Sequence, residues 1–264
     1  MPVDVSGLVV GVNAIAAGGT HTCALTSPGG VKCWGYNYYG QLGDGTNLDR
    51  LAPVDVTGLG SGVKAITAGD SHTCAIASSG GVKCWGKNLD GQLGDGTNGN
   101  RAFPVDVPGL GSGVKAIDAN YSHTCALTSS GGVKCWGYNY FGQLGNGTTS
   151  NSSLPVDVSG LGSGVNSIAA GGSHSCALML SGSVKCWGYN YDGELGNDDH
   201  YEKHTPVNVF GFESGINAIS TGSYHSCALS SSGGVYCWGN NYSSQIGDGS
   251  GLKITPVSVL GTPQ

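Results

Sequence analysis

Histidine and cysteine are the side chains of this sequence that could carry out chemistry, and they recur at a fixed interval. Each of five histidines is followed two positions later by a cysteine, and a second cysteine comes ten positions after the first. The histidines are His21, His72, His123, His174 and His225. A histidine with two cysteines could bind zinc, a histidine alone could transfer protons, and two cysteines could form a disulfide.

The spacing within each cysteine pair favours a disulfide. A symmetric hairpin centred on Pro28 places Cys23 and Cys33 directly opposite one another, with Cα atoms ~4.5–5.5 Å apart, a separation that a disulfide can bridge. The same arithmetic predicts Cys23–Cys33, Cys74–Cys84, Cys125–Cys135, Cys176–Cys186 and Cys227–Cys237. A buried pair of reduced cysteines is the alternative. No metal is expected, because a structural zinc normally takes four ligands.

Disulfides bear on where the protein works. They persist in oxidising compartments, so we expect an extracellular or secreted protein. The early apolar stretch Leu8–Ala17 recurs in later repeats with a lysine in it, so we do not interpret it as a signal peptide. We expect that any such peptide is absent from this chain.

We interpret the repeated histidines as structural. A catalytic histidine usually has an asymmetric setting with its own base or nucleophile, whereas here the same residue follows a glycine-rich turn in every repeat. Each second cysteine precedes a tryptophan, which we expect to pack as a large ring between repeats. These are Trp34, Trp85, Trp136, Trp187 and Trp238. No catalytic residue and no cofactor are predicted.

The elements that position these residues are short strands. In one repeat we expect strands at residues 63–68, 71–77 and 82–85, followed after a longer segment by Pro104–Val107. Proline at the start of the last strand suits an edge position, because it cannot donate to a ladder. Nothing has helical length or period.

Four short strands in a 51-residue unit that occurs five times predict an all-β fold. This pattern is typical of a β-propeller with one four-stranded blade per repeat. We expect a single domain over residues 1–264, with repeats at about 9–59, 60–110, 111–161, 162–212 and 213–261.

The stretches AAGGTHTCALT, VKCWGYNYYGQLGDGT and PVDV resemble the repeat of the regulator-of-chromosome-condensation family, over essentially the whole chain. The paired cysteines look more like bacterial members than eukaryotic ones. Propellers of this family usually have seven blades, and this chain has five repeats. Two arrangements therefore remain open, a closed five-blade ring and part of a larger propeller. Residues 2–5 repeat the Pro-Val segment and could form a ring-closing strand.

Charge and hydropathy exclude two classes of partner. The net charge is −6 and the only arginines are Arg50 and Arg101, whereas a nucleic-acid-binding protein needs a basic face. No stretch approaches the ~18 uninterrupted apolar residues of a membrane span. We therefore expect neither nucleic-acid binding nor membrane insertion.

Binding specificity must come from segments that differ between repeats. The segment after each Trp-Gly is rich in tyrosine, a residue that gives a large contact area at low entropic cost. Loops of successive blades would gather these rings at one end of the propeller. The alternative is that these tyrosines only fill space at the loop edges of the blades. The candidate binding residues are Tyr36, Tyr38, Tyr39, Tyr138, Tyr140, Phe141, Tyr189, Tyr191 and Tyr242.

Two acidic features are weaker candidates. Asp44 and Asp95 lie in Gly-Gln-Leu-Gly-Asp-Gly segments, but other repeats have Asn146 and Asn197 there, which fits a turn residue better than a calcium ligand. The segment Asp198–His204 is the only asymmetric cluster of titratable residues, and a solvated loop is the better interpretation.

The sequence thus predicts a non-enzymatic binding module that presents tyrosine-rich loops on one face of a rigid propeller to a protein or glycan partner. A bacterial member of the family inhibits β-lactamase in this manner. The alternative implied by the resemblance is guanine nucleotide exchange on a small GTPase, which an oxidising compartment would exclude. Light sensing through tryptophans with arginines, known in a plant member, is disfavoured because this chain has only two arginines.

Overall fold

The computed structural model describes residues 3–8 and 11–259. In these ranges the protein is all-β, with twenty strands and no helix. The strands form five sheets, and each sheet contains four strands that are consecutive along the chain. Neighbouring strands within a sheet are antiparallel. The described residues contain no helix that is long and apolar enough to cross a membrane.

Each sheet is one blade, and its strands are numbered from the innermost to the outermost. The first blade consists of β1 (Val12–Ala17), β2 (His21–Thr26), β3 (Gly30–Gly35) and β4 (Arg50–Asp55). The second consists of β5 (Val63–Ala68), β6 (His72–Ala77), β7 (Val82–Gly86) and β8 (Arg101–Asp106). The third consists of β9 (Val114–Asn120), β10 (His123–Thr128), β11 (Val133–Gly137) and β12 (Ser152–Asp157).

The last two blades repeat the pattern. The fourth consists of β13 (Val165–Ala170), β14 (His174–Met179), β15 (Val184–Gly188) and β16 (Lys203–Asn208). The fifth consists of β17 (Ile216–Thr221), β18 (His225–Ser230), β19 (Val235–Gly239) and β20 (Lys253–Ser258). The innermost strands contact one another in the order β1, β5, β9, β13, β17. This radial stacking of four-stranded sheets is a β-propeller architecture.

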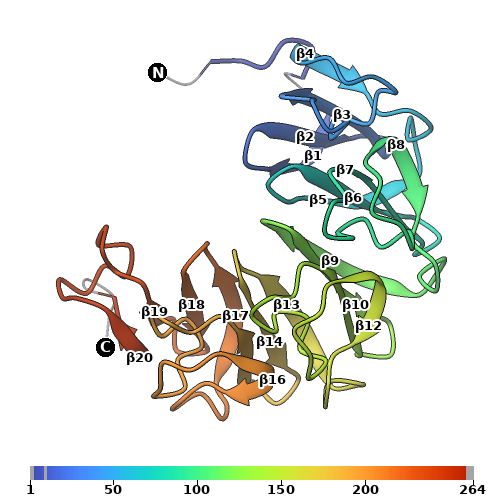
Figure 1. The fold of residues 1–264 in the computed structure, drawn as a ribbon. Coiled ribbons are helices and arrows are strands. Elements are labelled where there is room, and N and C mark those ends of the chain that lie inside the picture. The colour runs from blue at the N-terminus through green and yellow to red at the C-terminus, as the bar shows by residue number, and fades with distance from the viewer. Residues whose placement is uncertain (1–2, 9–10, 260–264) are drawn as a thin grey trace.

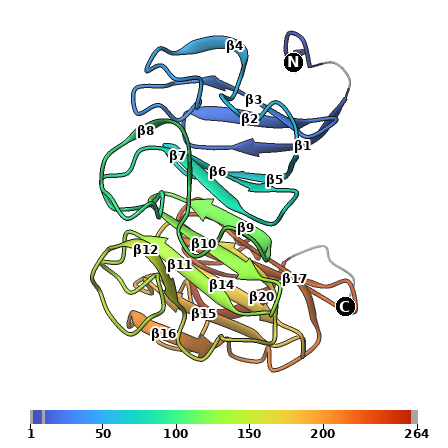
Figure 2. The same cartoon turned by 90° about the vertical axis from the view of Figure 1, so that its right-hand side faces the viewer.

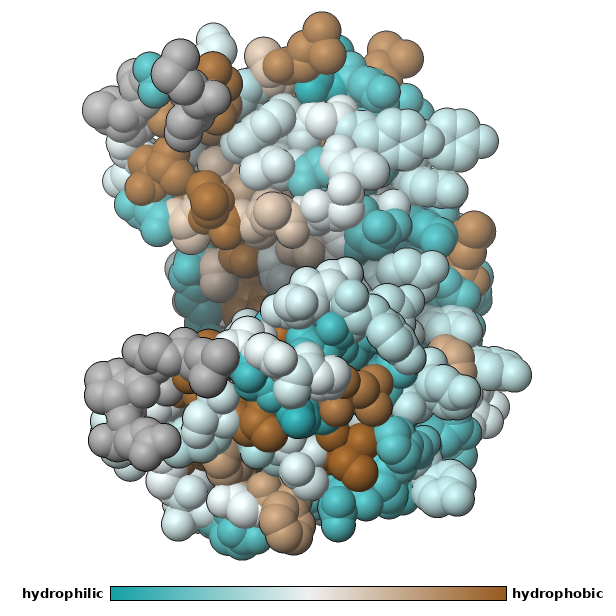
Figure 3. Space-filling view, turned by 90° about the vertical axis from the view of Figure 1, so that its left-hand side faces the viewer, coloured by the Kyte–Doolittle hydropathy of each residue, from teal (hydrophilic) through white to brown (hydrophobic). Residues whose placement is uncertain are grey.

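The five blades form an open arc, not a closed ring, as Figure 1 shows. Figure 2, turned by 90°, shows the first three blades stacked one below another. Pro2 of the expected ring-closing strand lies outside the described residues, and Val3–Val5 form no strand. Figure 3 views the open side of the arc and shows hydrophobic atoms around a hollow between its two ends. Ile15 of β1 is 72% exposed and Leu229 of β18 is 40% exposed.

The predicted hairpin register is confirmed. Cys23 pairs with Cys33 across β2 and β3, and the equivalent cysteines pair in every blade. All five disulfides are present, which excludes the reduced pairs. The Cα atoms of each bridged pair are 4.1 Å apart, slightly closer than expected.

The fourth strand differs most from expectation, whereas the second and third strands of this blade differ from it by one residue each. It begins at Arg101, three residues before Pro104, and ends at Asp106. The reason is an irregularity in the ladder: Cys84 pairs with Val105, the register then shifts, and Gly86 pairs with Arg101. Proline therefore lies inside this strand, which is the outermost of its sheet, where a missing donor can be tolerated.

The hydrophobic core lies between neighbouring blades. In the first interface Trp85 and Ala75 of the second blade pack with Cys23, Cys33 and Leu42 of the first. The same arrangement recurs at the next three interfaces. Four of the five tryptophans are fully buried, whereas Trp34 of the first blade is only partly buried, because no described blade precedes it. Each of the four buried rings thus packs against the preceding blade.

Candidate functional site

Two sets of connections lie at the same end of the propeller. In each blade the first and third strands run toward this end, so the turn before each histidine and the long loop after each Trp-Gly emerge together. Backbone contact confirms it, since Tyr36 N donates to Thr20 O at 3.0 Å. We call this end the loop face. Its inner turns are 18–20, 69–71, 121–122, 171–173 and 222–224, and its long loops are 36–49, 87–100, 138–151, 189–202 and 240–252.

A buried asparagine holds each long loop in shape. Asn139 is fully buried, its Oδ1 accepts from Leu144 N at 2.9 Å, and its Nδ2 donates to Ser150 O at 2.9 Å. The same residue acts likewise in the other blades, from Asn37 to Asn241. The asparagine is thus an internal clamp of the long loop, and the aromatic residues beside it are held on a fixed frame.

The aspartates of the Gly-Asp-Gly segments are turn residues, as the sequence favours. Asp44 accepts from Thr46 N at 3.0 Å and forms an ion pair with Arg50 at 2.7 Å. Burial opposes ionisation, but the hydrogen bonds from Thr46 and the contact with Arg50 together lower the pKa of Asp44. Asp95 and Arg101 repeat this pair at 2.8 Å. Both arginines of the chain are therefore committed to these loops.

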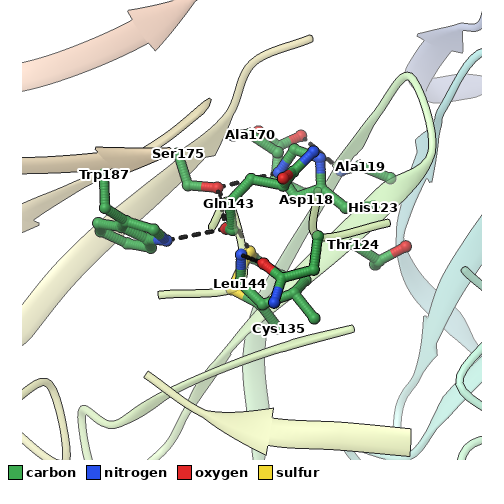
Figure 4. The surroundings of a disulfide bond; sticks show 12 residues. Asp118, Ala119, His123, Thr124, Cys135, Gln143, Leu144, Ala170, Ser175 and Trp187 are labelled. Carbon is green, nitrogen blue, oxygen red and sulfur yellow. Dashed lines mark hydrogen bonds between the residues drawn. A yellow bond between two sulfur atoms is a disulfide. The ribbon is translucent and has the colours of Figure 1, made fainter. Parts of the chain in front are cut away.

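Each of four histidines takes part in a hydrogen-bond network that crosses a blade boundary. His123 Nε2 lies 2.9 Å from Ser175 Oγ, Ser175 Oγ donates to Gln143 O at 3.0 Å, and Trp187 Nε1 donates to the same oxygen at 2.8 Å (Figure 4). Because the serine proton goes to the carbonyl, the imidazole must donate through Nε2. Its Nδ1 is buried without a hydrogen-bond partner among the described residues.

The electrostatics of the histidines match this arrangement. Burial lowers the pKa of His21 and His123 to about 4 and that of His72 and His174 to about 3. A fully buried neutral ring whose donor contacts the next blade is placed to hold blades together. These contacts support the structural interpretation over proton transfer to a bound substrate.

Five of the nine sequence-predicted aromatic residues gather into one cluster. Phe141 and Tyr189 join the third and fourth blades with ring centroids 4.8 Å apart, and Tyr189 lies 6.4 Å from Tyr224 of the fifth blade. Tyr138, Tyr140 and Tyr191 extend the cluster through ring contacts of 5.0–6.5 Å. We call this set the aromatic patch: Tyr138, Tyr140, Phe141, Tyr189, Tyr191 and Tyr224.

The other four predicted residues lie elsewhere on the loop face. Tyr36, Tyr38 and Tyr39 contact one another in the first blade, and Lys87 Nζ lies 5.8 Å from the Tyr39 ring centroid. Tyr242 is 82% exposed and lines a second depression, which it shares with Tyr191 of the aromatic patch and with Asp192, His200 and Leu252. Among the described residues, the nine therefore do not form one continuous set of ring contacts.

A cavity of about 450 Å³ opens between the aromatic patch and the inner turns. Its volume lies within the ~300–1,000 Å³ range of ligand pockets. Residues from four blades line it: Asp70, Tyr121, Tyr138, Phe141, Gly172, Ser173, Ser223 and Tyr224.

Sequence reasoning missed three of the lining residues, Asp70, Tyr121 and Tyr224. All lie in inner turns just before the repeated histidine. The available signal was that they interrupt the Gly-Gly-Ser and Gly-Gly-Thr pattern seen at Gly171–Ser173 and Gly18–Thr20.

An acidic substitution lies beneath the patch. Glu194 occupies the position of Gln41, Gln92 and Gln143 in earlier blades, and all four side chains are fully buried. Its Oε2 accepts from Asp192 N at 3.0 Å, whereas its Oε1 has no partner among the described residues. Burial raises the pKa of Glu194 to about 8. Burial, with Glu194 and Asp192 nearby, raises the pKa of Tyr189 to about 12, so this phenol stays protonated at neutral pH.

The titratable segment Asp198–His204 does not converge on a site. Its members contact their own loop: Lys203 pairs with Asp199 at 2.7 Å, and His204 contacts Glu202 at 3.0 Å. His200 Nδ1 lies 2.9 Å from Tyr191 O. In the described part of the chain no three His, Cys, Asp or Glu residues are placed to hold a metal ion.

Known proteins share this architecture. The family model of the RCC1-like domain matches residues 2–264. The chain is 32% identical to the ultraviolet-B receptor UVR8 of Arabidopsis thaliana over 252 residues, which is 93% of this chain and 57% of the receptor. It is 34% identical over 245 residues to the human E3 ubiquitin-protein ligase HERC2, covering 89% of this chain and 5% of the ligase.

Solved structures agree with the fold. Human WBSCR16 superposes with a TM-score of 0.83 at 26% identity, covering 94% of this chain and 67% of that protein. Prp20p of Saccharomyces cerevisiae superposes with a TM-score of 0.81 at 25% identity, covering 94% of this chain and 63% of Prp20p. With five four-stranded blades and a match along its length, this chain belongs to the family of RCC1-like domains.

Proposed function

We propose that the protein is a non-enzymatic interaction module that binds a protein partner through the aromatic patch. The observation that carries this proposal is the continuous set of tyrosine and phenylalanine rings from three blades at one end of a disulfide-braced scaffold. Tyr140 is 65% exposed and Tyr191 is 71% exposed, so both are available to a partner. Large rings held by a rigid frame are favoured in binding hot spots, because little entropy is lost on contact.

The comparisons support a protein as the partner. The yeast relative Prp20p was described together with its binding properties to Gsp1p and histones. The five disulfides support an oxidising, extracellular location for this chain. They weigh against nucleotide exchange on a small GTPase, which takes place in reducing compartments.

Affinity measurements on surface variants test the proposal. A partner is captured on the immobilised protein, identified by mass spectrometry and purified, and its Kd is measured for each variant. Replacing Tyr140 and Tyr191 with alanine together should weaken binding by more than about 2 kcal/mol if they act as hot spots. Leu180→Ala is the control, because Leu180 is 72% exposed in a turn at the opposite end. Unchanged affinity in the double variant would refute binding through the patch.

A further inference from the structure

We propose that the cavity beside the aromatic patch binds the guanidinium group of an arginine presented by a basic protein partner. The inference rests on the proposed function and names the chemistry that the loop face would recognise. It uses residues of the inner turns that lie outside the aromatic candidates identified in the sequence.

The lining of the cavity combines rings with one carboxylate. Tyr121, Tyr138 and Phe141 come from the third blade, Tyr224 from the fifth, and Asp70 from the second. The faces of aromatic rings attract cations, most strongly where water is displaced. Arginine suits such a site better than lysine, because its planar group stacks on rings and its fork of donors matches a carboxylate.

Asp70 has no counter-ion among the described residues. Its Oδ2 accepts from Ser71 Oγ at 2.9 Å, and it takes part in no salt bridge of the described chain. Its side chain is partly exposed where the cavity opens. A cationic ligand would act as the counter-ion of Asp70, whereas a neutral sugar would leave this carboxylate without a counter-ion.

The surroundings of the cavity are acidic as well. Asp90 lies close enough to Tyr138 to raise its pKa, although burial contributes more. Asp192 acts on the pKa of Tyr189 in the same direction, again after burial. None of the lining residues is basic, and Lys87 on the neighbouring loop lies over Tyr39 of the first blade. With a net charge of −6, the protein as a whole favours a basic partner.

The repeat supplies variants that should keep the fold. Positions 70 and 121 are both equivalent to position 223, which is a serine, so serine at either position has a precedent in another blade. Likewise, Tyr224 occupies the position of Ser71, Ser122 and Ser173. The substitutions Asp70→Ser, Tyr121→Ser and Tyr224→Ser therefore remove ligand contacts with little effect on the blade interfaces.

The test is an NMR titration of the whole chain with acetyl-Gly-Arg-Gly-amide, compared with the same peptide carrying uncharged citrulline. We expect saturable binding of the arginine peptide and at least tenfold weaker binding of the citrulline peptide. Asp70→Ser should weaken arginine binding at least tenfold, and Tyr121→Ser should act in the same direction. Glu213→Gln is the control, since Glu213 is exposed at the opposite end of the propeller. Equal affinity for the two peptides would overturn the proposal.

Further outcomes separate this inference from the proposed function. If alanine at Tyr140 and Tyr191 weakens binding of the captured partner while the arginine peptide does not bind, the cavity proposal fails and the interaction module stands. Saturable binding of maltotriose that Asp70→Ser leaves unchanged would also overturn it and assign the cavity to a glycan. If the arginine peptide binds but patch variants keep full affinity for the partner, the proposed function fails instead.

Discussion

His174 Nε2 of the fourth blade lies 2.9 Å from Ser226 Oγ of the fifth. This contact is one of four equivalent bonds, each of which links the second strand of one blade to that of the next. The hydroxyl also donates to a backbone carbonyl that the buried tryptophan indole contacts. The repeated histidine, the tryptophan and the hydroxyl residue thus belong to one hydrogen-bond network that joins neighbouring blades.

Removing one hydroxyl from this hydrogen-bond network should destabilise the protein. In Thr124→Val the His72 Nε2–H, 2.9 Å from Thr124 Oγ1, loses its acceptor while buried. A buried donor without a partner costs about 1–3 kcal/mol. Chemical denaturation should show a loss of that size, whereas Thr124→Ser, which copies Ser175 and Ser226, should remain close to the parent. Equal stability of the valine and serine variants would contradict a stabilising role for this hydrogen bond.

Glu194 should make stability depend on pH. Its pKa is about 8 in the folded protein, above the ordinary value of 4.5. The folded state therefore binds the proton more tightly, and its contribution to stability is complete below about pH 4.5 and is lost as the pH rises through 8. Since one pKa unit corresponds to about 1.4 kcal/mol, the parent should lose at least about 2 kcal/mol between pH 5 and 9 relative to Glu194→Gln.

The repeat provides the matched control for this prediction. Gln143→Glu places the same carboxyl at the equivalent buried position of the third blade, so it should add a second loss of stability over the same pH range. Denaturation curves at pH 5, 7 and 9 would measure both variants. If the free energy of unfolding changes with pH by the same amount in the parent and in Glu194→Gln, Glu194 ionises freely in the folded protein.

The disulfides should differ in their resistance to reduction. Cys23 and Cys33 are fully buried under the second blade, whereas Cys227 of the fifth blade is only partly buried because no described blade covers that face. Thiolate attack needs access to the sulfur. Mild reduction of the folded protein, followed by alkylation and peptide mass spectrometry, should label Cys227 and Cys237 first. Labelling that begins at Cys23 would contradict this order.

Much of the fold could be predicted because the repeat constrains it. The opposition of Cys23 and Cys33 follows from the symmetric turn, and the packing of Trp85 against the preceding blade follows from strand alternation. The start of β8 at Arg101 could not be predicted, since it depends on a register shift beside Gly86. The cavity could not be predicted for a different reason. Asp70 and Tyr224 are 154 positions apart in the sequence, and only the arrangement of the blades in space brings both to one cavity.

The asparagine clamp predicts that a buried amide controls the binding face without touching a partner. In Asn139→Ala, Leu144 N loses its acceptor and the carbonyls of Thr148 and Ser150 lose a donor. With this site fully buried, we expect a loss of about 2–3 kcal/mol in stability. The loop 138–151, which carries Tyr138, Tyr140 and Phe141, should then exchange its amide hydrogens faster than the other four long loops.

Binding should weaken in the same variant although every ring of the aromatic patch remains. Ordering the loop on contact would add an entropic cost that the parent does not have. Asn98→Ala is the matched control, because Asn98 is exposed in the equivalent loop of the second blade and its Nδ2 makes a single bond to Leu89 O, at 3.1 Å. That variant should keep both the exchange pattern and the affinity. If Asn139→Ala speeds exchange in its loop yet binds the partner as tightly as the parent, a fixed loop shape is not what makes the patch a binding surface.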